Sequence, residues 1–158
     1  MKKFIPLLIA LVFLMLSAEV FAKPLISVSM KAEKEVIINK VSKMVAADKV
    51  NPGDVILYTL SYVNSGDESA TSAFLDDPVP KGTVYLAGSA LGNDADVTFS
   101  IDGGKTFKKP SLLTYEVKIN GKVEKKIASP EQYTDIRWTV RVIPAHGSGQ
   151  VGFKVRVK

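Results

Sequence analysis

The sequence contains no cysteine and a single histidine, His146, which limits the chemistry that its side chains can perform. A Ser-His-Asp arrangement requires a histidine base that a third group orients. His146 instead lies in the segment Pro144 to Gly149, a Gly/Ser-rich loop between two predicted strands, and we interpret it as a solvated loop residue. The shortage of ligands also argues against a zinc site. The sequence therefore predicts a non-enzymatic chain with no catalytic residue and no cofactor.

Carboxylates that could hold a metal ion gather at Asp94, Asp96 and Asp102. Calcium takes about six to eight oxygen ligands, and the segment Asn93 to Asp96 offers several from one loop. This segment lacks the ligand pattern and the bidentate glutamate of a dedicated calcium loop. The alternative is that the aspartates cap their own backbone in turns. We predict no metal site and keep these three residues as calcium candidates.

One of these aspartates belongs to a compact motif. The residues are Ser100-Ile101-Asp102-Gly103-Gly104-Lys105-Thr106-Phe107. The motif resembles an Asp-box, the Ser-x-Asp-x-Gly-x-Thr-aromatic hairpin of sialidase-type propellers, where it is structural and lies away from the active site. The resemblance implies a tight hairpin in which Asp102 accepts backbone N–H bonds, and it implies no glycosidase.

Basic side chains alternate with apolar ones in the last two predicted strands, and they form one face if Asp135 to Val142 and Gln150 to Val157 pair as an antiparallel hairpin. Successive side chains of a strand point to opposite faces, so the apolar residues would share one face and the basic residues the other. The residues of this predicted ligand-binding face are Arg137, Arg141, Lys154 and Arg156, with Lys158 at its end. Arginine suits phosphate and carboxylate, so an acidic envelope polymer or an anionic lipid headgroup is the expected ligand. The alternative is a solvated face. With few aromatic side chains for stacking bases, nucleic acid is not expected as a partner.

Short strands with turn signals between them must position these residues, because the chain shows almost no helical periodicity. The clearest strand alternates Ile56, Tyr58, Leu60 and Tyr62 with Leu57 and Thr59, while Asn120-Gly121 is a strong hairpin signal. Strands are predicted over residues 26–32, 36–47, 54–64, 71–75, 84–86, 97–101, 113–118, 123–127, 136–142 and 151–157. This pattern predicts an all-β antiparallel sandwich. The predicted core consists of Tyr58, Leu60, Tyr62, Phe74, Leu75, Trp138, Val140, Val151, Phe153 and Val155.

Four motifs in the first half of the chain carry a resemblance to a known family. They are Pro52-Gly53-Asp54, Tyr58-Thr59, Asn64-Ser65-Gly66-Asp67 and Asp77-Pro78-Val79-Pro80-Lys81-Gly82-Thr83. This pattern resembles the bacterial and archaeal repeat family called domain of unknown function eleven. The resemblance implies an immunoglobulin-like sandwich in a surface or secreted protein, here as a single copy with an insertion around residues 89–129.

The first 22 residues have the features of a signal peptide. Lys2 and Lys3 precede an apolar run from Phe4 to Leu16, and Val20-Phe21-Ala22 supplies small residues before a cleavage site. The alternative is a transmembrane anchor, but the run is shorter than the roughly 20 residues needed to cross a bilayer. We predict cleavage after Ala22, which leaves one domain over residues 23–158, with no transmembrane anchor, in the periplasm or at the cell surface.

The chain has no cysteine, so an exported domain of this sequence must be held by its core alone. The sequence thus predicts an exported, non-enzymatic β-sandwich module that acts as a structural or adhesion element of the cell envelope, with other envelope proteins as partners. The alternative is a binding module for an acidic polymer or carbohydrate that uses the basic sheet face.

Overall fold

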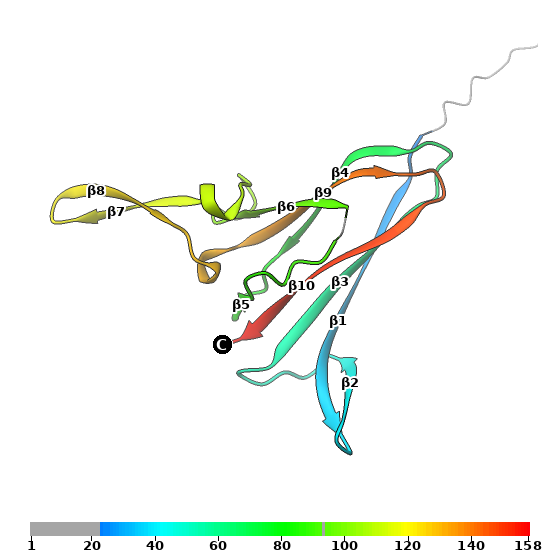
Figure 1. Cartoon of the computed structure of the whole chain (residues 1–158), viewed down its shortest axis with the longest axis horizontal. Helices are drawn as coiled ribbons and strands as arrows, with labels where there is room; N and C mark the ends of the chain where they lie inside the picture. The colour runs from blue at the N-terminus through cyan, green and yellow to red at the C-terminus, as the bar shows by residue number, and fades with distance from the viewer. Residues whose placement is uncertain (1–22, 93) are drawn as a thin grey trace, which may run out of the picture.

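The computed structural model describes residues 23–92 and 94–158, and the predicted signal peptide lies outside them. The described chain is all-β with antiparallel sheets (Figure 1). Its strands are β1 (Ile26–Ile38), β2 (Val41–Ala46), β3 (Val55–Asn64), β4 (Ala70–Pro78), β5 (Thr83–Tyr85), β6 (Ala95–Ser100), β7 (Thr114–Ile119), β8 (Lys122–Ile127), β9 (Asp135–Ile143) and β10 (Ser148–Val157). Two short 3-10 helices, η1 (Pro110–Leu112) and η2 (Pro130–Gln132), flank the β7–β8 hairpin. No helix in the described residues is both long and apolar enough to span a membrane.

The larger sheet has five strands in the order β2-β1-β3-β10-β5. At its centre, β3 pairs with β1 on one side and with β10 on the other, antiparallel to both. The alternation in β3 gives the strand one buried face, because Ile56 and Leu60 point inward and are buried while Val55, Thr59 and Val63 point outward. The strand predicted from residues 54 to 64 is confirmed.

The smaller sheet has three strands in the order β4-β9-β6, and it packs on the inner face of the larger one. Trp138 of β9 lies against Phe153 of β10, with ring centroids 5.8 Å apart, and Tyr85 of β5 lies against Phe99 of β6 at 4.9 Å. These contacts join the two layers into one apolar core. The insertion predicted around residues 89–129 contains β6, which completes this sheet, and the β7–β8 hairpin.

The predicted core is largely confirmed, with one error. Seven of the predicted residues are buried, namely Leu60, Leu75, Trp138, Val140, Val151, Phe153 and Val155. Tyr58 and Tyr62 are partly buried and pack against this core. Phe74 is 60% exposed, so its assignment to the core was wrong. Phe74 and Leu75 are neighbours in one strand and therefore lie on opposite faces, and Leu75 occupies the inner one.

Two pairs of strands extend beyond the sandwich as arms (Figure 1). In the first arm, the end of β1 turns back into β2 at Asn39 and Lys40, both with positive φ (53° and 65°). A single strand was predicted over residues 36–47 with a kink at this point, and the kink is a hairpin turn. In the second arm, Asn120 and Gly121 connect β7 and β8 with φ of 50° and 80°, which confirms the predicted hairpin.

Candidate functional sites

The basic face predicted on the last two strands is not formed, because β9 and β10 belong to different sheets. β9 pairs with β4 and β6, whereas β10 pairs with β3 and β5. The β9–β10 pairing on which the basic face depended is therefore absent, and the prediction of one shared face was wrong. The loop between the strands carries the chain from one layer to the other, and the two apolar faces meet in the core instead of lying side by side. Alternation fixes which side chains share a face of one strand, but it does not fix which strand is the neighbour.

The four basic residues are consequently divided between the two outer surfaces of the sandwich. Arg137 and Arg141 lie on the outer face of the smaller sheet, opposite in direction to buried Trp138. Lys154 and Arg156 lie on the outer face of the larger sheet, opposite in direction to buried Phe153 and Val155. These residues therefore do not share one face of the protein.

Arg137 is engaged within the protein rather than presented to a ligand. Its Nε and Nη2 donate hydrogen bonds of 2.6 Å to the two carboxylate oxygens of Asp76. Its guanidinium lies 3.9 Å from the ring centroid of Phe107 and 4.7 Å from that of Phe74. The hydrogen bonds with Asp76 raise the pKa of Arg137 above its usual value. The exposed ring of Phe74, which was wrongly assigned to the core, thus packs against the Arg137 guanidinium on the outer surface.

The calcium candidates do not converge on one point. No group of three or more potential metal-ligating His, Cys, Asp or Glu side chains is found within residues 23–92 and 94–158. Asp96 forms an ion pair with Lys109, and Asp94 is exposed in the turn just before β6. The carboxylate of Asp102 points toward its own loop. Each of the three aspartates thus lies in a different environment.

Asp102 forms the centre of the predicted Asp-box hairpin. Its Oδ1 accepts hydrogen bonds from the backbone N–H groups of Lys105 (3.2 Å) and Thr106 (3.0 Å), and its Oδ2 accepts one from the Thr106 hydroxyl (2.6 Å). The Ser100 hydroxyl also donates to Oδ1, at 2.7 Å. These donors hold the pKa of Asp102 well below its usual value. The expectation that Asp102 accepts backbone N–H bonds is confirmed.

A pair of carboxylates, buried Asp77 and partly buried Asp135, escaped the sequence analysis. Asp77 is 8% exposed, and the Oδ2 atoms of both residues have no hydrogen-bond partner in the described structure. Burial, together with the charge of Asp135, raises the pKa of Asp77 to about 6. Burial, and to a lesser extent the charge of Asp77, also raises the pKa of Tyr58. Alternation from buried Leu75 could have placed Asp77 on the inner face.

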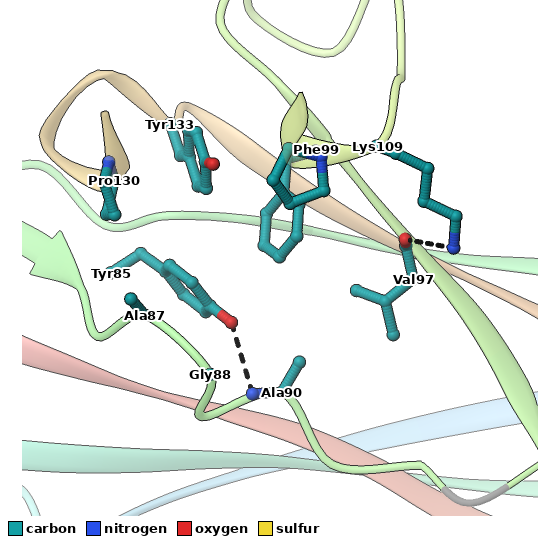
Figure 2. Close-up of a pocket in the computed structure, with 10 residues that line it drawn as sticks. Tyr85, Ala87, Gly88, Ala90, Val97, Phe99, Lys109, Pro130 and Tyr133 are labelled. Atoms are coloured by element: carbon teal, nitrogen blue, oxygen red, sulfur yellow. Dashed lines mark hydrogen bonds between the residues drawn. The ribbon is translucent and has the colours of Figure 1, made fainter. Parts of the chain in front are cut away.

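A cavity of about 450 Å³ opens where η1 and η2 border the core (Figure 2). Its floor is a cluster of Tyr85, Phe99 and Tyr133, in which Phe99 and Tyr133 have ring centroids 4.6 Å apart. The Tyr85 hydroxyl accepts a hydrogen bond from the Ala90 N–H at 3.2 Å. Lys109 is the one charged residue in the lining, and it donates to Asp96 and to the Val97 carbonyl. The cavity is thus an apolar hollow without the convergent polar groups that a catalytic site requires.

His146 lies in the β9–β10 loop, as its sequence surroundings predicted. Its Nε2 is 3.3 Å from Asp67 Oδ1, and both side chains are exposed. This arrangement can form a surface ion pair when the imidazole is protonated, and it offers no buried base.

A scan against protein-family models found no match, and searches of curated proteins and of solved structures found none either. The resemblance to domain of unknown function eleven stays a prediction from short motifs.

Proposed function

We propose that this chain is an exported, non-enzymatic module of immunoglobulin-like type that serves as a structural or adhesion element of the cell envelope and acts by surface contact. One observation carries the proposal. Large apolar side chains are exposed on both projecting arms, where they add nothing to the core. On the first arm they are Ile37, Ile38, Val41 and Met44, and on the second they are Ile119, Val123 and Ile127.

Physical reasoning links these arms to partners. An isolated two-stranded ribbon is marginally stable in water, and grouped exposed apolar side chains mark interaction surfaces. The second arm contacts the rest of the protein chiefly at its base, where Leu113 and Ala128 are buried. Its outer part is therefore available to another molecule, and other envelope proteins are the expected partners.

The proposed location outside the cytoplasm is inferred from the sequence. The charged start, the apolar run and Val20-Phe21-Ala22 support export and cleavage after residue 22. The alternative, a binding module for an acidic polymer or carbohydrate, rested on a single basic face. Arg137 is held by Asp76, and the other basic residues lie on two separate surfaces, so the geometry favours the contact module.

Fractionation of producing cells tests this proposal. We expect the wild-type chain in the envelope fraction, with an N-terminal sequence that begins at Lys23. Val123→Ser/Ile127→Ser should move it to the soluble exported fraction. The matched control is Lys118→Ser/Lys125→Ser, which changes the same face of the arm without removing apolar surface. Cytoplasmic wild-type protein that retains Phe4 to Leu16 would overturn the address, and equal retention of all three proteins would overturn the role of the arm.

A further inference from the structure

One edge of the larger sheet is left open along the first half of β1. β1 pairs with β3 from Ile26 to Lys34, but β2 pairs only with Glu33 to Ile38. The last contact on that side is the Ala47 N–H, which donates to the Ala32 carbonyl at 3.0 Å. Within the part of the chain that the structure describes, no strand lies beside Ile26 to Lys31 on the side away from β3.

Apolar side chains lie next to this open edge on the core side of the sheet. Val28 and Met30 are directly opposite Tyr62 and Leu60 of β3 and share their inward face. Leu60 is buried, yet Val28 is 49% exposed and Met30 is 59% exposed. The five-stranded sheet extends beyond the three-stranded one, so the core ends before it covers β1.

The open segment lacks the usual features that protect a sheet edge. Natural edges carry proline, inward-pointing charges or bulges that discourage pairing with another chain. Between Ile26 and Met30 there is neither proline nor a charged residue. Lys31 points outward, and its charge is balanced by Glu33 at 2.7 Å. A strand can therefore add to this edge without burying an unpaired charge.

The segment is complementary to itself in antiparallel register. If Ser29 of one copy lies opposite Ser29 of another, Val28 meets Met30, Met30 meets Val28, and Ser27 meets Lys31. Directly opposed residues share a face of the sheet. Apolar residues then meet apolar residues, polar residues meet polar ones, and no like charges are opposed.

The end of β2 is compatible with the same register. In each copy, β2 occupies the edge from Glu33 onward, and the Ala47 N–H extends this contact to Ala32. The free segment is therefore Ile26 to Lys31. With Ser29 opposite Ser29, the segments Ser27 to Lys31 of the two copies pair within this free edge and do not overlap β2.

We propose that two copies of this chain associate through β1 into a two-fold symmetric dimer, with the Ser29 residues opposed at the axis. The dimer has one continuous sheet in which the strands of the two copies run β3-β1-β1-β3. Val28 and Met30 of both copies form an apolar cluster that joins the two cores. Because the contact is isologous, it closes on itself and leaves no further β1 edge for growth.

Engineered cysteines test the register, since the natural chain has none. Directly opposed residues of an antiparallel pair have Cα atoms about 4.5–5.5 Å apart, within the range of a disulfide. Ser29→Cys should form a covalent dimer under mild oxidation. The matched control is Ser61→Cys, which lies opposite Ser29 on β3 and on the same face. Its two copies would be about 14 Å apart, three strand spacings, and should not cross-link.

Charge substitutions at Ser27 test the facing pair Ser27–Lys31 by sedimentation equilibrium of the purified chain over a concentration series. Ser27→Glu places two opposite-charge pairs in the contact and should lower the dimer dissociation constant about fivefold. Ser27→Lys places two like-charge pairs there and should raise it about fivefold.

A monomer at all concentrations would overturn the proposal, and so would a dimer that Ser29→Cys does not cross-link. Cross-linking of Ser61→Cys as fast as Ser29→Cys, or equal effects of Ser27→Glu and Ser27→Lys, would also overturn it. The experiment uses purified protein, so its failure leaves the proposed envelope function untouched. Loss of envelope retention through the second arm would equally leave the dimer untouched.

Discussion

Asp76 and Arg137 lie directly opposite each other on β4 and β9 and form a bidentate pair on the outer face of the smaller sheet, with both hydrogen bonds at 2.6 Å. The planar guanidinium also lies over the rings of Phe74 and Phe107. Phe107 belongs to the Asp-box hairpin. The Arg137 side chain therefore connects β4 and β9 to the loop that carries this hairpin. The arrangement is a structural link rather than an anion site.

Arg137→Lys should lower the free energy of unfolding by about 1 kcal/mol, because lysine cannot reproduce the bidentate fork or the stacking. The pair is partly exposed, so solvent screening limits the loss. Urea denaturation measures the change. Arg141→Lys, exposed on the same face of the same strand, is the control and should alter stability by less than about 0.5 kcal/mol. Equal effects at the two positions would show that the fork contributes nothing.

Trp138 is fully buried at the centre of the core, so its truncation should be costly. We expect Trp138→Ala to lower the free energy of unfolding by about 3–5 kcal/mol. Trp138→Phe should cost much less, because it keeps a ring against Phe153 and removes an indole N–H that has no partner in the described structure. Chemical denaturation followed by far-UV circular dichroism compares the variants. An unchanged midpoint for Trp138→Ala would place this ring outside the core.

Asp77 should make the protein more stable at mildly acidic than at neutral pH. Its folded pKa of about 6 lies above the unfolded value of 3.8, so the folded state binds more protons between these values. Stability from this group is full below pH 3.8 and is lost as the pH rises through 6. Between pH 5 and 7 the loss should be about 1 kcal/mol.

The comparison that isolates this effect is wild type against Asp77→Asn across that range. The variant should lose this part of the pH dependence, whereas Asp48→Asn, at an exposed position, should follow the wild type. Asp54, Asp102 and Glu131 have lowered pKa values, so their contributions are lost only as the pH falls further. Parallel profiles for wild type and Asp77→Asn would remove Asp77 as the cause.

Asp102 should order its hairpin without binding metal. Asp102→Ala removes the acceptor for the Lys105 and Thr106 N–H groups, and amide hydrogen exchange at these two positions should become faster. Asp94→Ala, in the other part of the candidate set, should leave their exchange unchanged. Addition of calcium should not slow exchange in the wild type. Slower exchange in calcium, lost in both variants, would revive a metal site.

Sequence reasoning succeeded where the signal was local. Alternation identified the central strand β3 and the buried face of β9, and Asn120-Gly121 identified the β7–β8 turn. The Asp-box motif also specified the hydrogen bonds of Asp102, because acceptor and donors lie within a few residues of each other. In each case the interaction that fixes the structure is contained in the segment that was read.

Failures arose where the outcome depended on distant parts of the chain. The partners of β9 and β10 are set by how two whole layers pack, so adjacent strands in the sequence separated into different sheets. Arg137 appeared free because its partner Asp76 lies far away in the sequence. The open edge of β1 depends on where β2 stops and on the width of the opposing sheet, and neither has a local signature.

The position of β3 between β1 and β10 has a mechanical consequence. Both neighbours run antiparallel to β3, so β1 and β10 point in the same direction. The start of β1 and the end of β10 therefore lie at opposite ends of the sheet (Figure 1). A force that pulls these ends apart acts along the strands. It therefore shears the hydrogen bonds between β1 and β3 and those between β3 and β10. The hydrogen bonds of a sheared pair resist together, whereas those of a peeled hairpin break one after another. The sandwich is thus arranged to transmit tension along its own chain.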